Sequence, residues 1–101
     1  MAAPTYRLDA LLQLEKQIEY IERDSPTNAK RVAKKISDAV AMIGRNPHIG
    51  PERDDLGPGL RSWWVKPVTL LYRLEEDDSV VIVLVAGRGQ LLEALADEYD
   101  V

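Results

Sequence analysis

Cysteine is absent from this 101-residue sequence, and so is any long apolar run. Without cysteine the chain forms no disulfide, offers no thiolate nucleophile and builds no zinc site on sulfur ligands, and it suits a reducing compartment. No apolar stretch approaches the ~20 residues that a membrane-spanning helix needs. Residues 1–8 also lack the basic and apolar regions of a signal peptide. We therefore expect a cytoplasmic protein that makes no contact with a membrane.

The sequence also lacks a basic overall balance and any familiar catalytic signature. Its formal net charge is −4, so direct, strong nucleic-acid binding is not expected, although local basic patches remain compatible with that charge. It contains no Walker sequence, nucleophile elbow or metal-ligand spacing, and we expect no cofactor and no metal. His48, the only histidine, has no evident partner for proton transfer and is expected to be an ordinary loop residue.

Three strands are predicted in the second half of the chain. Residues 60–66 alternate in character with a period of two and stop at Pro67, which has no backbone donor for a strand interior. Residues 68–74 form the second strand, and four acids followed by serine at 75–79 form a turn. Residues 80–85 are a continuous β-branched run without a polar face, so they should lie inside the sheet with both faces covered.

Two amphipathic helices are predicted before the sheet, after a short edge strand at residues 5–8. Asp9 can cap the first helix, and Ser25 followed by Pro26 suits the start of the second. Their apolar faces recur at spacings of three and four: Leu11, Leu14, Ile18 and Ile21 in the first helix, and Ala29, Val32, Ala33, Ile36, Ala39, Val40 and Ile43 in the second. Because the connection is so short, the helices should form an antiparallel hairpin against the sheet.

The second helix carries a basic stripe of Lys30, Arg31, Lys34 and Lys35. A solvated stripe, or one paired with the acids of the first helix, is the favoured interpretation, and a phosphate-binding surface is the alternative. Residues 46–59 are too rich in breakers for a regular element. Residues 90–99 predict a short C-terminal helix whose apolar side either docks on the sheet or serves a partner.

The predicted fold class is therefore α+β, in one domain over residues 1–101: a short N-terminal strand, an antiparallel helix hairpin packed on a small antiparallel sheet, and a short C-terminal helix. This series resembles the RelE/ParE toxin superfamily of type II toxin–antitoxin modules, and in particular its ParE-like, plasmid-stabilisation branch. The resemblance covers residues 5–90 and rests on motifs in register: Tyr6-Arg7-Leu8, Ser25-Pro26, Asn46–Gly50, LGPGLRS at 56–62, Tyr72-Arg73, the acidic turn at 75–78 and Gly87-Arg88.

The resemblance implies a compact toxin with a RelE/ParE-like fold and a cognate partner. That partner is a ParD-like antitoxin, encoded in the same operon, whose disordered C-terminal segment wraps over the helix hairpin and the sheet. Members of the ParE branch are described as poisoning DNA gyrase, and RelE-type members as cutting mRNA on the ribosome. The chain is accordingly expected to inhibit growth by binding gyrase.

The ribonuclease alternative needs groups that transfer protons and cations that hold a charged phosphorane. If the chain is RelE-like, its catalytic residues are Arg61, Arg73 and Arg88. However, the position after Arg88 is glycine rather than a second basic residue, and the terminal Tyr99 lies farther along the chain than the RelE pattern expects. The set is incomplete, which favours a toxin that acts by binding and has no active site of its own.

The three arginines then have two interpretations. Each is either a structural residue that pairs with an acid such as Asp54 or Glu75, or a contact to the target or the antitoxin. Consecutive tryptophans on a strand point to opposite faces, so one should be core and the other a partner anchor. The predicted contact residues are Arg61, Trp63, Trp64, Arg73, Arg88, Leu91 and Leu95. The unusually acidic net charge leaves a third alternative, an attenuated homologue that acts only as an antitoxin-binding module.

Overall fold

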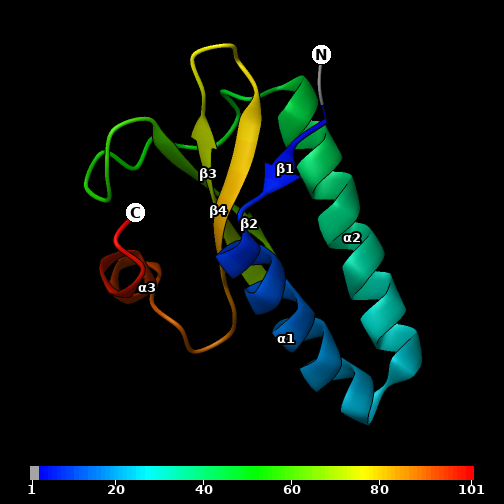
Figure 1. Ribbon diagram of the computed structural model, residues 1–101. Helices are drawn as coiled ribbons and strands as arrows, with labels where there is room; N and C mark the ends of the chain where they lie inside the picture. The colour runs from blue at the N-terminus through cyan, green and yellow to red at the C-terminus, as the bar shows by residue number, and fades with distance from the viewer. Residues whose placement is uncertain (1–2) are drawn as a thin grey trace.

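A four-stranded sheet lies at the centre of the molecule (Figure 1). A computed structural model of the chain describes residues 3–101, so the first two residues of the expected domain lie outside the described residues. The strands are β1 (Thr5–Tyr6), β2 (Leu60–Val65), β3 (Val68–Leu74) and β4 (Val80–Ala86), in the order β1-β4-β3-β2. As predicted, β2, β3 and β4 are antiparallel. The short β1 adds a parallel edge, which makes the sheet mixed.

Strand β4 is interior and apolar on both faces, as its β-branched run predicts. It pairs with β1 on one side and β3 on the other. Ile82 and Val85 belong to one buried cluster, whereas Val83 and Leu84 belong to the second cluster on the opposite face. A register shift opposite Leu71 and Tyr72 accounts for two successive β4 residues serving the same face, since a bulge adds one residue to a strand.

Helices α1 (Leu8–Asp24) and α2 (Pro26–Arg45) form the predicted antiparallel hairpin and cover one face of the sheet (Figure 1). Ile36 and Ile43 of α2 are buried among side chains of β3 and β4. Ser25 separates the helices, and its hydroxyl accepts a hydrogen bond from the Asn28 amide at 3.1 Å, while Pro26 opens α2. This is the N-cap arrangement that the sequence predicts.

Helix α3 (Leu92–Glu98) covers the opposite face of the sheet. Leu92, Leu95 and Ala96 are buried against Leu60 of β2, Leu71 of β3 and β4 residues. Of the two alternatives for the C-terminal helix, the structure therefore shows docking on the sheet.

Along the side of β4 that faces away from β3, the backbone is paired partly by the N-terminal segment and partly by a side chain of α1. The Arg7 amide donates to the Ile82 carbonyl at 2.9 Å, and farther along the strand the Val85 amide donates to Gln13 Oε1 at 2.8 Å. Because α1 turns away directly after β1 and begins at Leu8, the expected cap Asp9 lies within its first turn instead. The predicted edge strand is shortened to two residues for the same reason.

Candidate functional site

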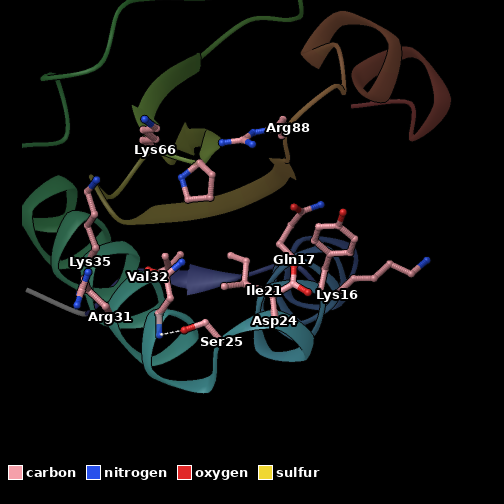
Figure 2. A pocket seen from close by; sticks show the side chains of 13 residues that line it. Lys16, Gln17, Ile21, Asp24, Ser25, Arg31, Val32, Lys35, Lys66 and Arg88 are labelled. Atoms are coloured by element: carbon pink, nitrogen blue, oxygen red, sulfur yellow. Dashed lines mark hydrogen bonds between the residues drawn. The ribbon is translucent and has the colours of Figure 1, made fainter.

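An open groove of about 690 Å³ lies between the turn end of the helix hairpin and one end of the sheet. Figure 2 shows Arg31 and Lys35 of α2 on one side, and Lys66 and Arg88 on the side of the sheet. Lys66 stands in the turn between β2 and β3, and Arg88 follows β4. The groove is thus assembled from four chain segments: α1, the start and middle of α2, the β2–β3 turn and the end of β4.

The groove is strongly positive although the chain as a whole is negative. Five cations line it, against one carboxylate, that of Asp24: Lys16, Arg31, Lys35, Lys66 and Arg88. None of the five takes part in an ion pair within residues 3–101. Since the net charge of the chain is −4, the remaining surface is correspondingly acidic. Such a contrast concentrates anionic ligands at one place.

The structure divides the basic stripe of α2 between two environments. Lys34 pairs with Asp38 of the same helix at 2.8 Å, one turn farther along. Arg31 and Lys35 instead line the groove, and Lys30 is exposed elsewhere on the helix. No ion pair joins the stripe to the acids of α1 among the described residues, so cross-pairing between the helices does not account for these charges.

The floor of the groove is apolar. Ile21 of α1 and Val32 of α2 lie between the charged walls (Figure 2). Pro67, in the turn between β2 and β3, also lines the groove. Tyr20 lies on the rim and is 68% exposed. The lining holds no histidine and a single carboxylate, that of Asp24. What the groove can do is hold an anionic ligand that also carries apolar groups.

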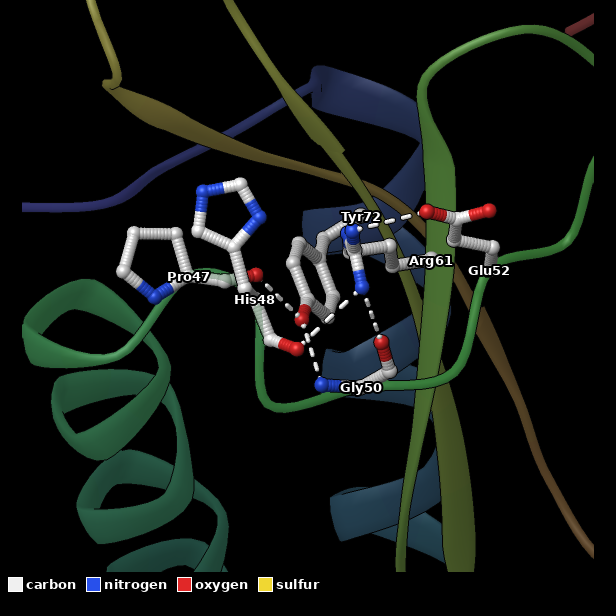
Figure 3. Close-up of polar contacts among 6 residues, drawn as sticks. All are labelled: Pro47, His48, Gly50, Glu52, Arg61 and Tyr72. Carbon is white, nitrogen blue, oxygen red and sulfur yellow. Dashed lines mark hydrogen bonds and ion pairs between the residues drawn. The ribbon is translucent and has the colours of Figure 1, made fainter.

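Arg61 is not in this groove but holds the loop at residues 46–59 (Figure 3). Its guanidinium donates to the His48 and Gly50 carbonyls at 3.2 and 2.7 Å and to Glu52 Oε1 at 3.2 Å. The side chain of Arg61 is only 16% exposed. Arg61 thus makes the contacts of a structural residue. Its partners are two backbone carbonyls and Glu52, and not the expected Asp54 or Glu75.

The neighbouring Tyr72 completes the loop attachment. Its hydroxyl accepts from the Gly50 amide at 3.0 Å and donates to the Pro47 carbonyl at 2.7 Å (Figure 3). The Tyr72 side chain is buried, and this burial raises the pKa of its hydroxyl. Tyr72 and Arg61 are paired across β3 and β2, so both serve the same face of the sheet.

The three arginines named for RNA cleavage do not converge. Arg73 is paired with Leu60, one position from the Arg61–Tyr72 pair, and therefore projects from the opposite face to Arg61. Arg88 lines the basic groove, whereas Arg61 lines a separate hollow beside Glu52. Tyr99, the terminal tyrosine, packs under α3. This arrangement brings no two of the three arginines to one site.

The predicted apolar contact residues divide into exposed and buried members. Trp64 is 69% exposed on the edge strand β2, and Trp63 packs against the core, as the opposite directions of the pair predict. Leu91 is 70% exposed immediately before α3. Leu95 is 8% exposed and belongs to the core beneath α3. In this arrangement Leu95 is not accessible to a partner, because it lies on the inner side of α3, whereas Leu91 precedes the helix in an extended conformation and points outward.

An ion cluster ties the 46–59 loop to α3. Arg53 donates to the Asp55 carboxylate at 3.0 Å and to Glu93 Oε1 at 2.7 Å. The hydrogen bond from Arg53 lowers the pKa of Asp55. The pKa of Glu93 is lowered first by its own backbone amide and then by Arg53. Both carboxylates are exposed, so the cluster contributes modestly to stability.

We expect acid to weaken this attachment. A carboxylate whose pKa is lowered by folding stabilises the fold above its ordinary pKa of about 4, and that contribution is lost as the pH falls through the folded value. Glu93→Gln should therefore reduce the loss of stability as the pH falls below the ordinary pKa of a glutamate. Urea unfolding at a series of pH values measures it, with Glu98→Gln on the same helix as the control. An equal acid dependence in wild type and Glu93→Gln would contradict the assignment.

Two other kinds of feature are absent from residues 3–101. No group of three or more histidine, aspartate or glutamate side chains is arranged to hold a metal ion there. Nor is any helix of that part long and apolar enough to cross a membrane.

Sequence reasoning named Arg88 but did not predict the groove. Lys16 and Tyr20 are one turn apart on α1 and resemble any solvated helix face, so nothing in the sequence distinguishes them. Lys66 follows a strand whose other residues suggested a partner surface. The sequence does offer one signal, the positive charge of Arg31 and Lys35 on α2. It is easily missed, because the acids of α1 are expected to neutralise this charge.

Comparison with known proteins identifies relatives over nearly the whole chain. Residues 5–92 match the family described as "ParE toxin of type II toxin-antitoxin system, parDE". Toxin ParE3 of Caulobacter vibrioides is 45% identical over 61 residues, which are 60% of this chain and 61% of that relative. A structure described as the chromosomal ParDE TA system from P. aeruginosa superimposes with a TM-score of 0.71 at 17% identity, covering 86% of this chain and 96% of that one.

Proposed function

We propose a function from one premise: the chain belongs to the ParE toxin family of type II toxin–antitoxin systems. It acts in the cytoplasm as the growth-inhibiting component of such a module, by binding DNA gyrase, and a ParD-like antitoxin from the same operon neutralises it. The α+β fold of the ParE family, with its helix hairpin and small sheet, supports the membership.

The observation that carries the proposal is the groove with an apolar floor and cationic walls. An antitoxin whose C-terminal half is acidic and amphipathic matches it in both respects: its apolar side chains cover Ile21 and Val32, and its carboxylates meet the surrounding cations. Arg88 is the member of the predicted contact set that lies in the groove. Trp64 and Leu91 are accessible and complete the proposed contact surface outside it.

Four of the predicted contact residues have a smaller part in this proposal: Arg61, Arg73, Trp63 and Leu95. Arg61 is engaged by the loop, and Trp63 and Leu95 pack into the core. Arg73 is half-buried on β3, on the face that α3 covers. The separation of Arg61, Arg73 and Arg88 favours a toxin that acts by binding over a ribonuclease, because cleavage requires its cations around one phosphate.

The experiment is induced expression in a bacterial host followed by assays with purified protein. We expect growth arrest with DNA damage or loss of supercoiling, inhibition of gyrase supercoiling in vitro, and rescue by co-expression of the neighbouring antitoxin gene. Cuts in mRNA that require ribosomes would overturn the gyrase proposal and move the protein to the RelE branch. Tight antitoxin binding without toxicity would identify an attenuated homologue.

A further inference from the structure

The cations of the groove come from three of its sides rather than from one element. Lys16 is supplied by α1, Arg31 and Lys35 by α2, and Lys66 and Arg88 by the sheet (Figure 2). A ligand that satisfies both walls must carry negative charge at several places along its length. A compact anion such as a single carboxylate meets only one or two of these side chains, whereas a polyanion meets most of them.

The rim also offers an aromatic face. Tyr20 is one turn from Lys16 on α1, lines the groove and keeps 68% of its surface exposed. Sites for single-stranded nucleic acids combine these two elements, a positive groove that follows the phosphates and an aromatic side chain on which a base stacks. The groove is open on one side, with a volume of about 690 Å³, so a flexible single strand can lie along it.

We propose that the groove binds a short segment of single-stranded nucleic acid, with its phosphates held by the five cations and one base stacked on Tyr20. This inference goes beyond the proposed function and does not depend on it; because both ligands are assigned to one groove, an antitoxin segment competes with the strand for it. The acidic surface outside the groove repels polyanions and so confines binding to this place. The binding is accordingly weak and local, which agrees with the absence of strong nucleic-acid binding expected from the net charge.

The test measures, by fluorescence anisotropy, the binding of a fluorescently labelled oligothymidylate of twelve nucleotides to the whole chain. We expect a Kd in the micromolar range at low salt. The slope of log K against log salt should be about −2 to −3.5, which corresponds to release of counterions from three to five phosphates at ~0.7 each. A twelve-residue oligouridylate measured in parallel distinguishes DNA from RNA as the preferred strand.

Four variants locate the site. Lys35→Ala should reduce the slope by about 0.7, because one phosphate contact is lost. Tyr20→Ala should weaken binding about tenfold, and Tyr20→Phe should restore it because stacking needs the ring and not the hydroxyl. Lys30→Ala removes an equal charge from an exposed position of α2 outside the groove and serves as the matched control.

Three results would overturn the inference: no oligonucleotide binding at low salt, equal effects of Lys35→Ala and Lys30→Ala, or no effect of Tyr20→Ala. Binding of a twelve-residue polyglutamate as tight as that of oligothymidylate would also overturn it, since the groove would then recognise charge without bases. Each of these outcomes leaves growth arrest and antitoxin binding to be measured separately, so the two proposals fail independently.

Discussion

The double variant Lys66→Glu/Arg88→Glu is expected to bind the antitoxin at least about 100-fold more weakly than the wild type. Both residues are exposed and lie outside the hydrophobic core, in the β2–β3 turn and just after β4, so the fold should be retained. Reversal replaces two attractions to an acidic segment with two repulsions, and like charges facing each other across an interface cost several kcal/mol. Each tenfold loss of affinity corresponds to about 1.4 kcal/mol.

The measurement is calorimetric titration of the purified toxin with the antitoxin at several salt concentrations. Lys30→Glu/Arg45→Glu is the matched control, because both side chains are exposed on α2 and the total charge changes by the same amount outside the groove. Retained affinity in the control together with a large loss in the groove variant is the expected result. Equal losses in both would attribute the effect to total charge, and the groove would no longer be the docking site.

Tyr72→Phe is expected to lower the free energy of unfolding by about 1–3 kcal/mol, the range for leaving a buried polar group without its partner. The hydroxyl bonds both the Gly50 amide and the Pro47 carbonyl, and Gly50 is buried, so its amide has no ready replacement. For a domain of this size each kcal/mol corresponds to a melting temperature lower by about 4–8 °C. Thermal unfolding followed by circular dichroism measures the change.

Tyr20→Phe is the control for this prediction, since the Tyr20 side chain is exposed and makes no hydrogen bond within the described residues. A companion variant, Gly50→Ala, should be destabilised for a steric reason, because a methyl group there collides with the Ser62 carbonyl and crowds the Tyr72 hydroxyl. Equal melting temperatures for wild type and Tyr72→Phe would show that the hydroxyl does not fasten the loop.

Tyr72 also determines the direction in which the stability of the fold changes at high pH. Burial raises the pKa of Tyr72 above its ordinary value of about 10. A group whose pKa is raised by folding stabilises the fold fully below its ordinary pKa, and this contribution disappears as the pH rises through the folded value. The contribution of the neutral hydroxyl should thus be lost in strong alkali, and Tyr72→Phe should not show that loss.

The strands and helices could be predicted from the sequence because local patterns determine them. Pro67 and the acids at 75–78 interrupt the apolar runs, so β2, β3 and β4 were predicted within one residue of their observed ends. Only two residues of β1 pair with β4, and no pattern that short can specify a parallel partner 76 positions away. The apolar spacing of α3 suits a sheet and a partner equally, so the sequence does not determine where this helix lies.

The candidate site could not be predicted in the same way. The groove unites residues 16, 31, 35, 66 and 88, whose proximity is a result of the completed fold. Under its structural interpretation, Arg61 is expected to pair with acidic side chains. Two of its three acceptors are instead backbone carbonyls. Every residue has such a carbonyl, so no sequence pattern identifies these partners. The sequence predicts Leu91 and Leu95 together as contact residues, because one helical turn would place them on the same face, but α3 begins only at Leu92 and leaves Leu91 exposed outside the helix.

The position of β4 between β1 and β3 has a consequence for how the protein is made. During translation the nascent chain releases β1 and the helix hairpin first, yet neither has its sheet until residues 80–86 emerge near the C-terminus. The apolar face of α2, including Ile36 and Ile43, packs in a cluster that includes Ile82 and Val85 of β4, so this cluster is incomplete until then. Because Arg88 also lines the groove, a product of synthesis interrupted before β4 lacks both the completed sheet and the complete groove.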